Sequence, residues 1–140
     1  MMRSAAVCLA LLWSAGLGHA QSSPPASTAV GVFTEEQAKR GAAAYDANCA
    51  VCHGPELRSA DREVPRLSDK AFTFSWVGKT IGEKFELIRN TMPPKQEKSL
   101  DDQVYLDILT YILSFNKIPS GKQPLKPDLK ILEKIEIAAP

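Results

Sequence analysis

The stretch Cys49-Ala50-Val51-Cys52-His53 is the part of the chain from which the rest is interpreted. Its two thiols are separated by about one helical turn, so both can lie on the same side of a short helix. The imidazole of His53 follows directly and offers a nitrogen ligand for iron. A run with this spacing is typical of c-type haem attachment, in which both thiols bond covalently to one porphyrin and the histidine binds its iron.

A C-x-x-C pair has two other common interpretations, a thioredoxin-type redox dithiol and half of a zinc site. The redox dithiol is typical of a βαβ setting, and the sequence shows no such pattern. A zinc site needs two further cysteine or histidine ligands, for which the sequence offers no supporting motif. The sequence therefore favours haem attachment over both alternatives.

Residues 1–20 have the pattern of a secretory signal peptide. Arg3 is their one charge, residues 5–17 are largely apolar, and Gly18 and Ala20 supply the small residues of a cleavage site. The apolar run is shorter than the roughly 20 residues that span a bilayer, which disfavours an uncleaved membrane anchor. We therefore expect cleavage after Ala20, no transmembrane anchor in the mature chain, and export, most simply to a bacterial periplasm. Haem attachment of this type also takes place after export.

Removal of the signal peptide simplifies the chemistry of the chain. The mature part contains two cysteines, one histidine, one methionine (Met92) and one tryptophan (Trp76), so no thiol is left for a structural disulfide. Loss of Arg3 from 17 basic residues leaves 16, which balance the 16 acidic residues. This balance excludes a strongly basic nucleic-acid-binding protein, and no nucleic acid is expected as a partner.

The first predicted helix begins after Thr34 and leads directly into the C-x-x-C-H run. Thr34 and Gln37 have the spacing of a capping box, and Ala38 and Tyr45 fall on one apolar face. Gly41 inside this helix costs about 1 kcal/mol relative to alanine. Either this glycine is merely tolerated, or a second helix approaches the backbone closely there.

Residues 54–77 show neither the alternation of a strand nor the period of a helix, and we interpret them as a charged loop. The segment Pro65-Arg66-Leu67 offers a backbone carbonyl that can lie beside the ring of His53. Three aromatic side chains of the loop either cover an edge of the porphyrin or belong to the core: Phe72, Phe74 and Trp76.

The next predicted helix carries the second candidate ligand of iron at its end. Thr80 and Glu83 form a capping box at its start, and Pro93 should end it at Met92. A methionine that continues an apolar helix face is commonly a core residue. The mature chain, however, offers no other methionine and no second histidine for the sixth position. We therefore predict that Met92 binds the iron.

The last predicted helix starts at Ser99, and Asn116 is a plausible C-terminal cap. Its apolar residues form one continuous stripe: Leu100, Val104, Ile108, Tyr111, Ile112 and Phe115. Prolines then enforce an extended course over residues 117–140, which end in a clearly apolar segment. This tail either packs back on the body or serves as a strap that docks on a partner.

Taken in order, these motifs resemble those of class I c-type cytochromes. The resemblance covers residues 33–116, between a leader over residues 21–32 that we expect to be disordered and the tail. It rests on Gly41, Tyr45, Cys49, Cys52, His53, Pro65, Leu67, Met92, Ile108 and Tyr111. It implies an all-α fold of three to five helices around one covalently bound haem c, in which the first and last helices cross near Gly41 and Tyr111.

The resemblance also implies a low-spin iron between His53 and Met92, with the carbonyl of Pro65 accepting a hydrogen bond from His53. Leu67 and Trp76 complete the expected cofactor contacts. The region from 74 to 93 is similar to the cytochrome modules associated with quinoprotein alcohol dehydrogenases. The charged insert at residues 58–63 departs from the shortest members of the class.

The expected function is one-electron transport in the periplasm, from a dehydrogenase to a respiratory oxidase or another cytochrome, without substrate chemistry. Two alternatives remain open. One is a permanent cytochrome subunit of a dehydrogenase complex, which would share the same haem chemistry. The other is a catalytic or gas-sensing haem protein, which requires an open sixth position, and Met92 argues against it.

Overall fold

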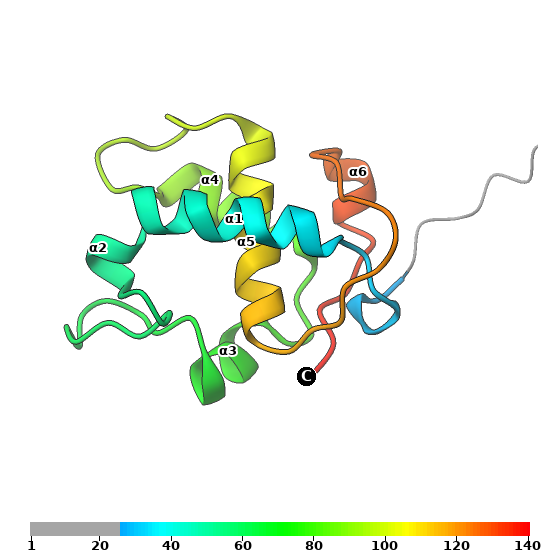
Figure 1. Cartoon of the computed structure of the whole chain (residues 1–140), viewed down its shortest axis with the longest axis horizontal. Helices are drawn as coiled ribbons and strands as arrows, with labels where there is room; N and C mark the ends of the chain where they lie inside the picture. Colours follow the sequence, from blue (N-terminus) through cyan, green and yellow to red (C-terminus); the bar gives the residue numbers. More distant parts are fainter. Residues whose placement is uncertain (1–25) are drawn as a thin grey trace, which may run out of the picture.

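The computed structural model describes residues 26–140. The predicted signal peptide, its cleavage site and the first part of the predicted leader lie outside the described residues. The described chain is helical, with isolated bridges but no strand (Figure 1), which confirms the predicted all-α fold. In this part of the chain, no helix combines the length and apolar character needed to cross a membrane.

Within residues 26–140, six α-helices and one 3-10 helix form, more than the three to five helices expected. They are η1 (Thr28–Val30), α1 (Glu35–Asn48), α2 (Ala50–His53), α3 (Asp69–Trp76), α4 (Ile81–Thr91), α5 (Asp102–Phe115) and α6 (Leu129–Leu132). The excess arises because α2 and α6 are only one turn long and because α3 has no strong pattern in the sequence. The core lies between α1, α4 and α5, and the tail closes it.

The crossing of α1 and α5 is the closest helix packing in the fold. A Cβ atom built on Gly41 would lie 2.5 Å from the carbonyl carbon of Asp107 and 3.0 Å from the Cβ of Tyr111. Glycine is therefore required for this approach, which confirms the predicted crossing. One turn further along α1, the rings of Tyr45 and Tyr111 pack with their centroids 5.2 Å apart.

The predicted capping box at the start of α1 is only half formed. The hydroxyl of Thr34 accepts a hydrogen bond from the backbone N–H of Gln37 (3.2 Å), as predicted. The side chain of Gln37, however, does not return to Thr34. It is buried and binds Leu125 of the tail, donating to the carbonyl (3.0 Å) and accepting from the N–H (2.8 Å). The buried backbone of the tail needs these partners, which a local pattern cannot reveal.

The reciprocal capping box predicted for α4 is confirmed. The hydroxyl of Thr80 accepts from the N–H of Glu83 (3.1 Å), and the carboxylate of Glu83 accepts from the N–H of Thr80 (2.7 Å). At its other end, α4 stops at Thr91, and Met92 caps it in an extended conformation. The prediction that Pro93 ends this helix is thus correct.

The loop predicted over residues 54–77 is wrong for residues 69–76, which form α3. Phe72 and Trp76 are buried one turn apart and stack with ring centroids 5.4 Å apart. The start of α3 is held by Asn116, whose side-chain oxygen accepts a hydrogen bond from the N–H of Asp69 (3.1 Å). Ser68 at the N-cap and Asp69 in the first turn are local signals, but Ser68 makes no capping hydrogen bond, and the partner that holds this start lies at the end of α5.

The last long helix, α5, begins three residues later than predicted. Asp101 is its N-cap, and residues 99–101 precede the helix. The side chain of Asp102 binds Arg89 of α4 in an ion pair. This pair fixes the first turn of α5 against the last turn of α4. Asn116 caps the other end of α5, as predicted.

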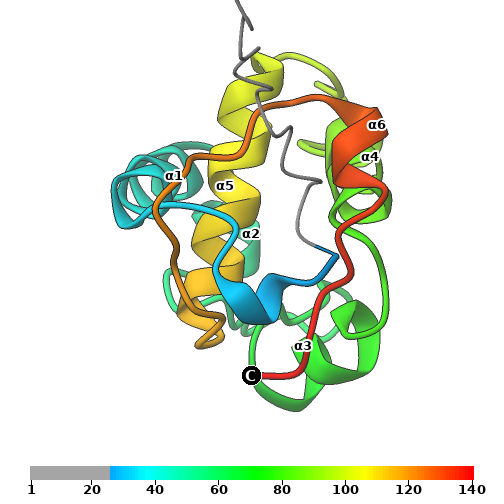
Figure 2. The ribbon, with the colours of Figure 1, turned by 90° about the vertical axis from the view of Figure 1, so that its right-hand side faces the viewer.

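The tail packs on the body of the protein, which is the first of the two alternatives. Leu132, Ile135 and Ile137 are fully buried. Figure 2 shows the tail running beside the N-terminal segment, and the N–H of Thr28 donates to the carbonyl of Glu136 (2.9 Å). Residues 26–32 therefore differ from the disordered leader that was expected, because the tail supplies hydrogen-bond partners for their backbone.

Candidate haem-binding site

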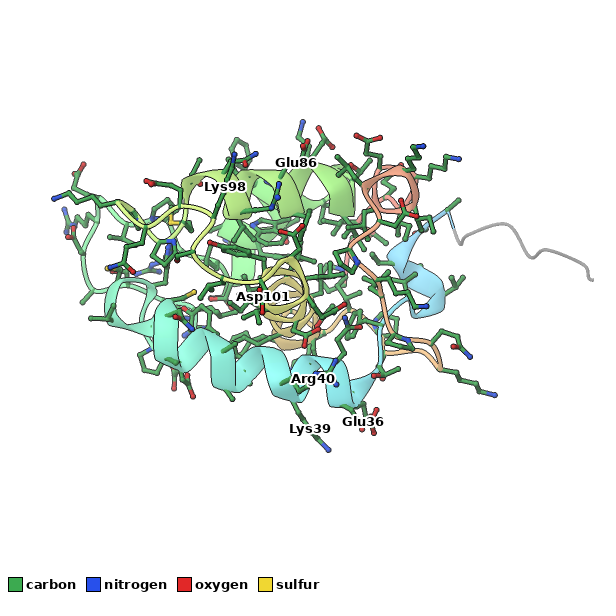
Figure 3. The ribbon with its side chains drawn as sticks, turned by 90° about the horizontal axis from the view of Figure 1, so that it is seen from above. Glu36, Lys39, Arg40, Glu86, Lys98 and Asp101 are labelled. Atoms are coloured by element: carbon green, nitrogen blue, oxygen red, sulfur yellow. The ribbon has the colours of Figure 1, made fainter. Side chains whose placement is uncertain are left out.

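The predicted ligands of iron come from segments at one end of the molecule. In Figures 1 and 3, helix α2, the loop over residues 54–68 and the segment over residues 92–101 all lie at the left end. The N-terminal segment and α6 lie at the opposite end in both views. The fold thus brings the predicted fifth and sixth ligands to the same end of the protein.

The C-x-x-C-H run forms a turn of helix that is anchored at both ends by Tyr45. The chain bends at Cys49, which is both the C-cap of α1 and the N-cap of α2. Its N–H donates to the backbone carbonyl of Tyr45 (2.8 Å). The hydroxyl of the same tyrosine donates to the carbonyl of Gly54 (2.8 Å), just after α2. Burial raises the pKa of this hydroxyl, which therefore stays protonated as the donor.

His53 is oriented by a backbone carbonyl, as the resemblance implies. Its Nδ1 lies 3.1 Å from the carbonyl oxygen of Pro65, and the residue is 9% exposed. Because a carbonyl oxygen only accepts, the proton of the neutral ring belongs on Nδ1. The lone pair of Nε2 is then left for a metal, and metal-binding histidines typically have this arrangement. The structure therefore places Pro65 where it was expected.

The two thiols do not have the properties of a redox dithiol. Cys52 is exposed and Cys49 is half-buried, and burial together with the charge of Cys52 raises the pKa of Cys49 to about 11. Reactive dithiols depend instead on a lowered thiol pKa. Among the residues that the structure describes, no group of three or more His, Cys, Asp or Glu side chains gathers as a metal site.

Met92 is held in place through its backbone. Its N–H donates to the carbonyl of Ile88 (2.8 Å), the last such bond of α4. Its own carbonyl accepts a hydrogen bond from the buried hydroxyl of Tyr105 on α5 (2.9 Å). The half-buried side chain thus starts from a backbone that is fixed on both sides. Local spacing does not reveal this role of Tyr105, because its partner lies 13 positions away in the chain.

The other two predicted cofactor contacts, Leu67 and Trp76, are engaged with other parts of the protein. Leu67 is half-buried, and its carbonyl accepts from the side chain of Asn116 (2.9 Å), which ties the loop to α5. Trp76 is only 4% exposed, and its ring stacks on Phe72 of the same helix. Phe74 is 92% exposed. Contact of Leu67 and Trp76 with the cofactor stays a prediction.

A cavity of about 740 Å³ lies away from these residues, between the N-terminal segment and the tail. Val32, Leu125 and Ile135 form its apolar wall, and Lys122 and Lys126 its polar one. None of the predicted haem contacts lines this cavity. It therefore has no part in the candidate site.

Comparison with known families agrees with this geometry. Residues 36–112, more than half of the chain, match the family model described as cytochrome c oxidase, cbb3-type, subunit III. The chain belongs to this c-type cytochrome family. The match spans α1 to α4 and most of α5 and thus includes the C-x-x-C-H run and Met92. No solved structure matches the chain.

Membership of this cytochrome family implies covalently bound haem c with iron and a role in electron transfer. The residues of the site fit that group, because two accessible thiols and one oriented imidazole are the donors that it requires. Cys49 and Cys52 would hold the porphyrin, and His53 the iron. When bound, haem c supplies a reversible one-electron couple. The carbonyl of Pro65 orients the imidazole, and Tyr45 fixes the turn that carries both thiols.

Proposed function

We propose that the mature chain is an exported, single-haem electron carrier of the class I type, with iron held between His53 and Met92. The observation that carries the proposal is the hydrogen bond from Nδ1 of His53 to Pro65, beside two thiols in a C-x-x-C-H turn. The sequence contains a single C-x-x-C-H run, which supports one haem per chain. The fixed backbone of Met92 supports a filled sixth position, which favours electron transfer over gas sensing.

The proposed route runs from a dehydrogenase in the periplasm to a respiratory acceptor. Similarity of the region from 74 to 93 to the cytochrome modules of quinoprotein alcohol dehydrogenases supports the donor. The family description, which names a respiratory oxidase, supports an oxidase or a cytochrome on the acceptor side. Export is supported by the signal-peptide pattern of residues 1–20 and by the chemistry of covalent haem attachment.

A permanent cytochrome subunit is the second candidate, and the family description, which names a subunit, favours it. In one form of this candidate, the tail would hold the subunit in its complex. The structure argues against that form. Leu132, Ile135 and Ile137 are buried in the protein's own core and are not available to hold a partner. Purification of the native protein from its source distinguishes the candidates, because a carrier elutes alone and a permanent subunit elutes with its complex.

The haem proposal is tested by mass and by visible spectrum. Intact-mass analysis of the exported protein should give the chain from Gln21 plus one haem, and acid-acetone should not extract it. The oxidised protein should show a weak methionine-iron charge-transfer absorption. The Cys52→Ser variant is the matched control, because it keeps one thiol and should show a spectrum with one unsaturated vinyl group. Extractable haem, or a mass without one haem, would contradict the proposal.

A further inference from the structure

Lys84 is a nearly buried cation that no carboxylate in the described chain neutralises. It lies in the first half of α4 and is 9% exposed. The ion pairs of the described residues join other side chains: Arg40 with Asp107, Arg58 with Asp69, and Arg89 with Asp102. Figure 3 labels Arg40, the basic partner in the first of these ion pairs. Lys84 has no such partner among the residues described.

The ammonium of Lys84 lies instead over an aromatic ring, 5.3 Å from the centroid of Trp76. The face of a tryptophan attracts a cation, but it carries no formal charge. Burial lowers the pKa of Lys84, the charge of Lys79 lowers it further, and Glu83 acts in the opposite direction. Buried lysines are rare unless they are paired, so this position calls for an anion.

The position of Lys84 on α4 indicates where that anion comes from. Lys84 and Ile88 are four residues apart and share one side of α4, and Met92 follows Ile88 after four more residues, just beyond the end of the helix. Lys84 thus lies about 12 Å along the helix axis from the predicted sixth ligand. Its aromatic partner, Trp76, is itself a predicted cofactor contact. Trp76 and Met92 are thus both predicted to contact the cofactor, which can supply the anion for Lys84.

We propose that Lys84 is the cationic partner of a propionate carboxylate of the bound haem and that it raises the reduction potential of the iron. This inference rests on the proposed function, since the haem brings the anion. Reduction adds one electron to the iron, so a fixed positive charge beside the porphyrin favours the reduced state. Lys84 is a positioning and tuning residue, and the ligands of iron remain His53 and Met92.

Spectroelectrochemical titration of the haem-loaded protein and three variants tests this inference. Lys84→Met keeps an unbranched side chain over Trp76 but removes the charge. The equilibrium constant for reduction should fall by about tenfold, which is 59 mV for a one-electron couple. Lys84→Arg should retain the potential of the wild type. Lys79→Met removes the same charge from an exposed site nearby and should change the potential much less, because water and salt screen it.

The outcomes separate this inference from the proposed function. A wild-type protein without a haem c spectrum would contradict the proposed function. A normal wild-type spectrum with an unchanged potential in Lys84→Met would overturn only the role of Lys84. An equal fall in Lys79→Met would overturn it as well, because the effect would then be one of general surface charge. Lys84→Gln provides the same measurement if the methionine variant does not fold.

Discussion

Replacement of Gly41 by alanine tests the packing on which the fold depends. The added methyl group would lie 2.5 Å from the carbonyl carbon of Asp107, and closer still to its oxygen. A flexible side chain could move away, but this neighbour is the backbone of α5. The side chain of Asp107 is also held, by Arg40 (2.8 Å) and Gln37 (2.9 Å). The two helices must therefore separate to admit one methyl group.

The expected cost follows from two opposing effects. Overpacking of a well-filled core typically costs about 1–3 kcal/mol, and a rigid backbone neighbour places Gly41→Ala near the upper end. Alanine favours the helix over glycine by about 1 kcal/mol, which offsets part of this cost. We therefore expect the free energy of unfolding to fall by about 2 kcal/mol. Gly41→Val should cost more, because valine adds bulk and has a lower helix propensity.

Guanidinium unfolding of the haem-loaded proteins, followed by far-ultraviolet circular dichroism, measures this change. The midpoint should fall while the slope stays the same, because the folded state keeps its surface. Ala43→Val is the matched control, since Ala43 is exposed on the same helix and its substitution should cost about 0.7 kcal/mol or less. If Gly41→Ala is as stable as the wild type, helix propensity outweighs packing, and the crossing is not as tight as described.

Two further predictions concern the sixth ligand and the tail. Met92→Ala should lower the reduction potential and abolish the methionine-iron charge-transfer absorption, because a thioether stabilises reduced iron. An unchanged spectrum would remove Met92 from the site. Truncation after Asn116 should lower the melting temperature and leave electron uptake from the donor nearly normal, because the tail is part of the core. Normal melting with slower uptake would instead indicate a docking strap.

The features that the sequence predicts well are those whose partners lie close together in the chain. Thr80 and Glu83 are three residues apart and form the capping box of α4 by themselves. Pro93 ends the same helix through its own geometry at the preceding residue. Helix α1, which leads into the C-x-x-C-H run, also begins at a local signal, because Thr34 accepts from the N–H of Gln37 three residues later. Such elements need no knowledge of the tertiary structure.

The features that the sequence does not reveal depend on distant partners. Helix α3 begins where Asn116, 47 positions away, binds the N–H of Asp69. Gln37 leaves its expected capping role because the backbone of Leu125, 88 positions away, occupies its side chain. Neither partner can be chosen from local spacing. Residues 26–32 take a defined conformation for the same reason, because the tail supplies hydrogen-bond partners for their backbone.

The helix that leads to Met92 is held at both of its ends, by the tail at its start and by α5 at the other end. At the start of α4, the N–H of Ile81 donates to the carbonyl of Ile135 (2.9 Å). A Cβ on Gly82 would lie 2.8 Å from the backbone nitrogen of Glu133, so the tail covers this turn without a gap. At the other end, the hydroxyl of Tyr105 fixes the carbonyl of Met92.

Figure 3 shows α4 running from the end of the molecule that carries α6 towards the end that carries α2. The tail therefore braces the start of α4, at the end of this helix that lies away from α2. Under the proposed ligation by Met92, this fixed backbone favours electron transfer, because movement of the ligand would add to the barrier. Loss of the tail should therefore lower stability through the start of α4, while the hydrogen bond from Tyr105 keeps the backbone of Met92 in place.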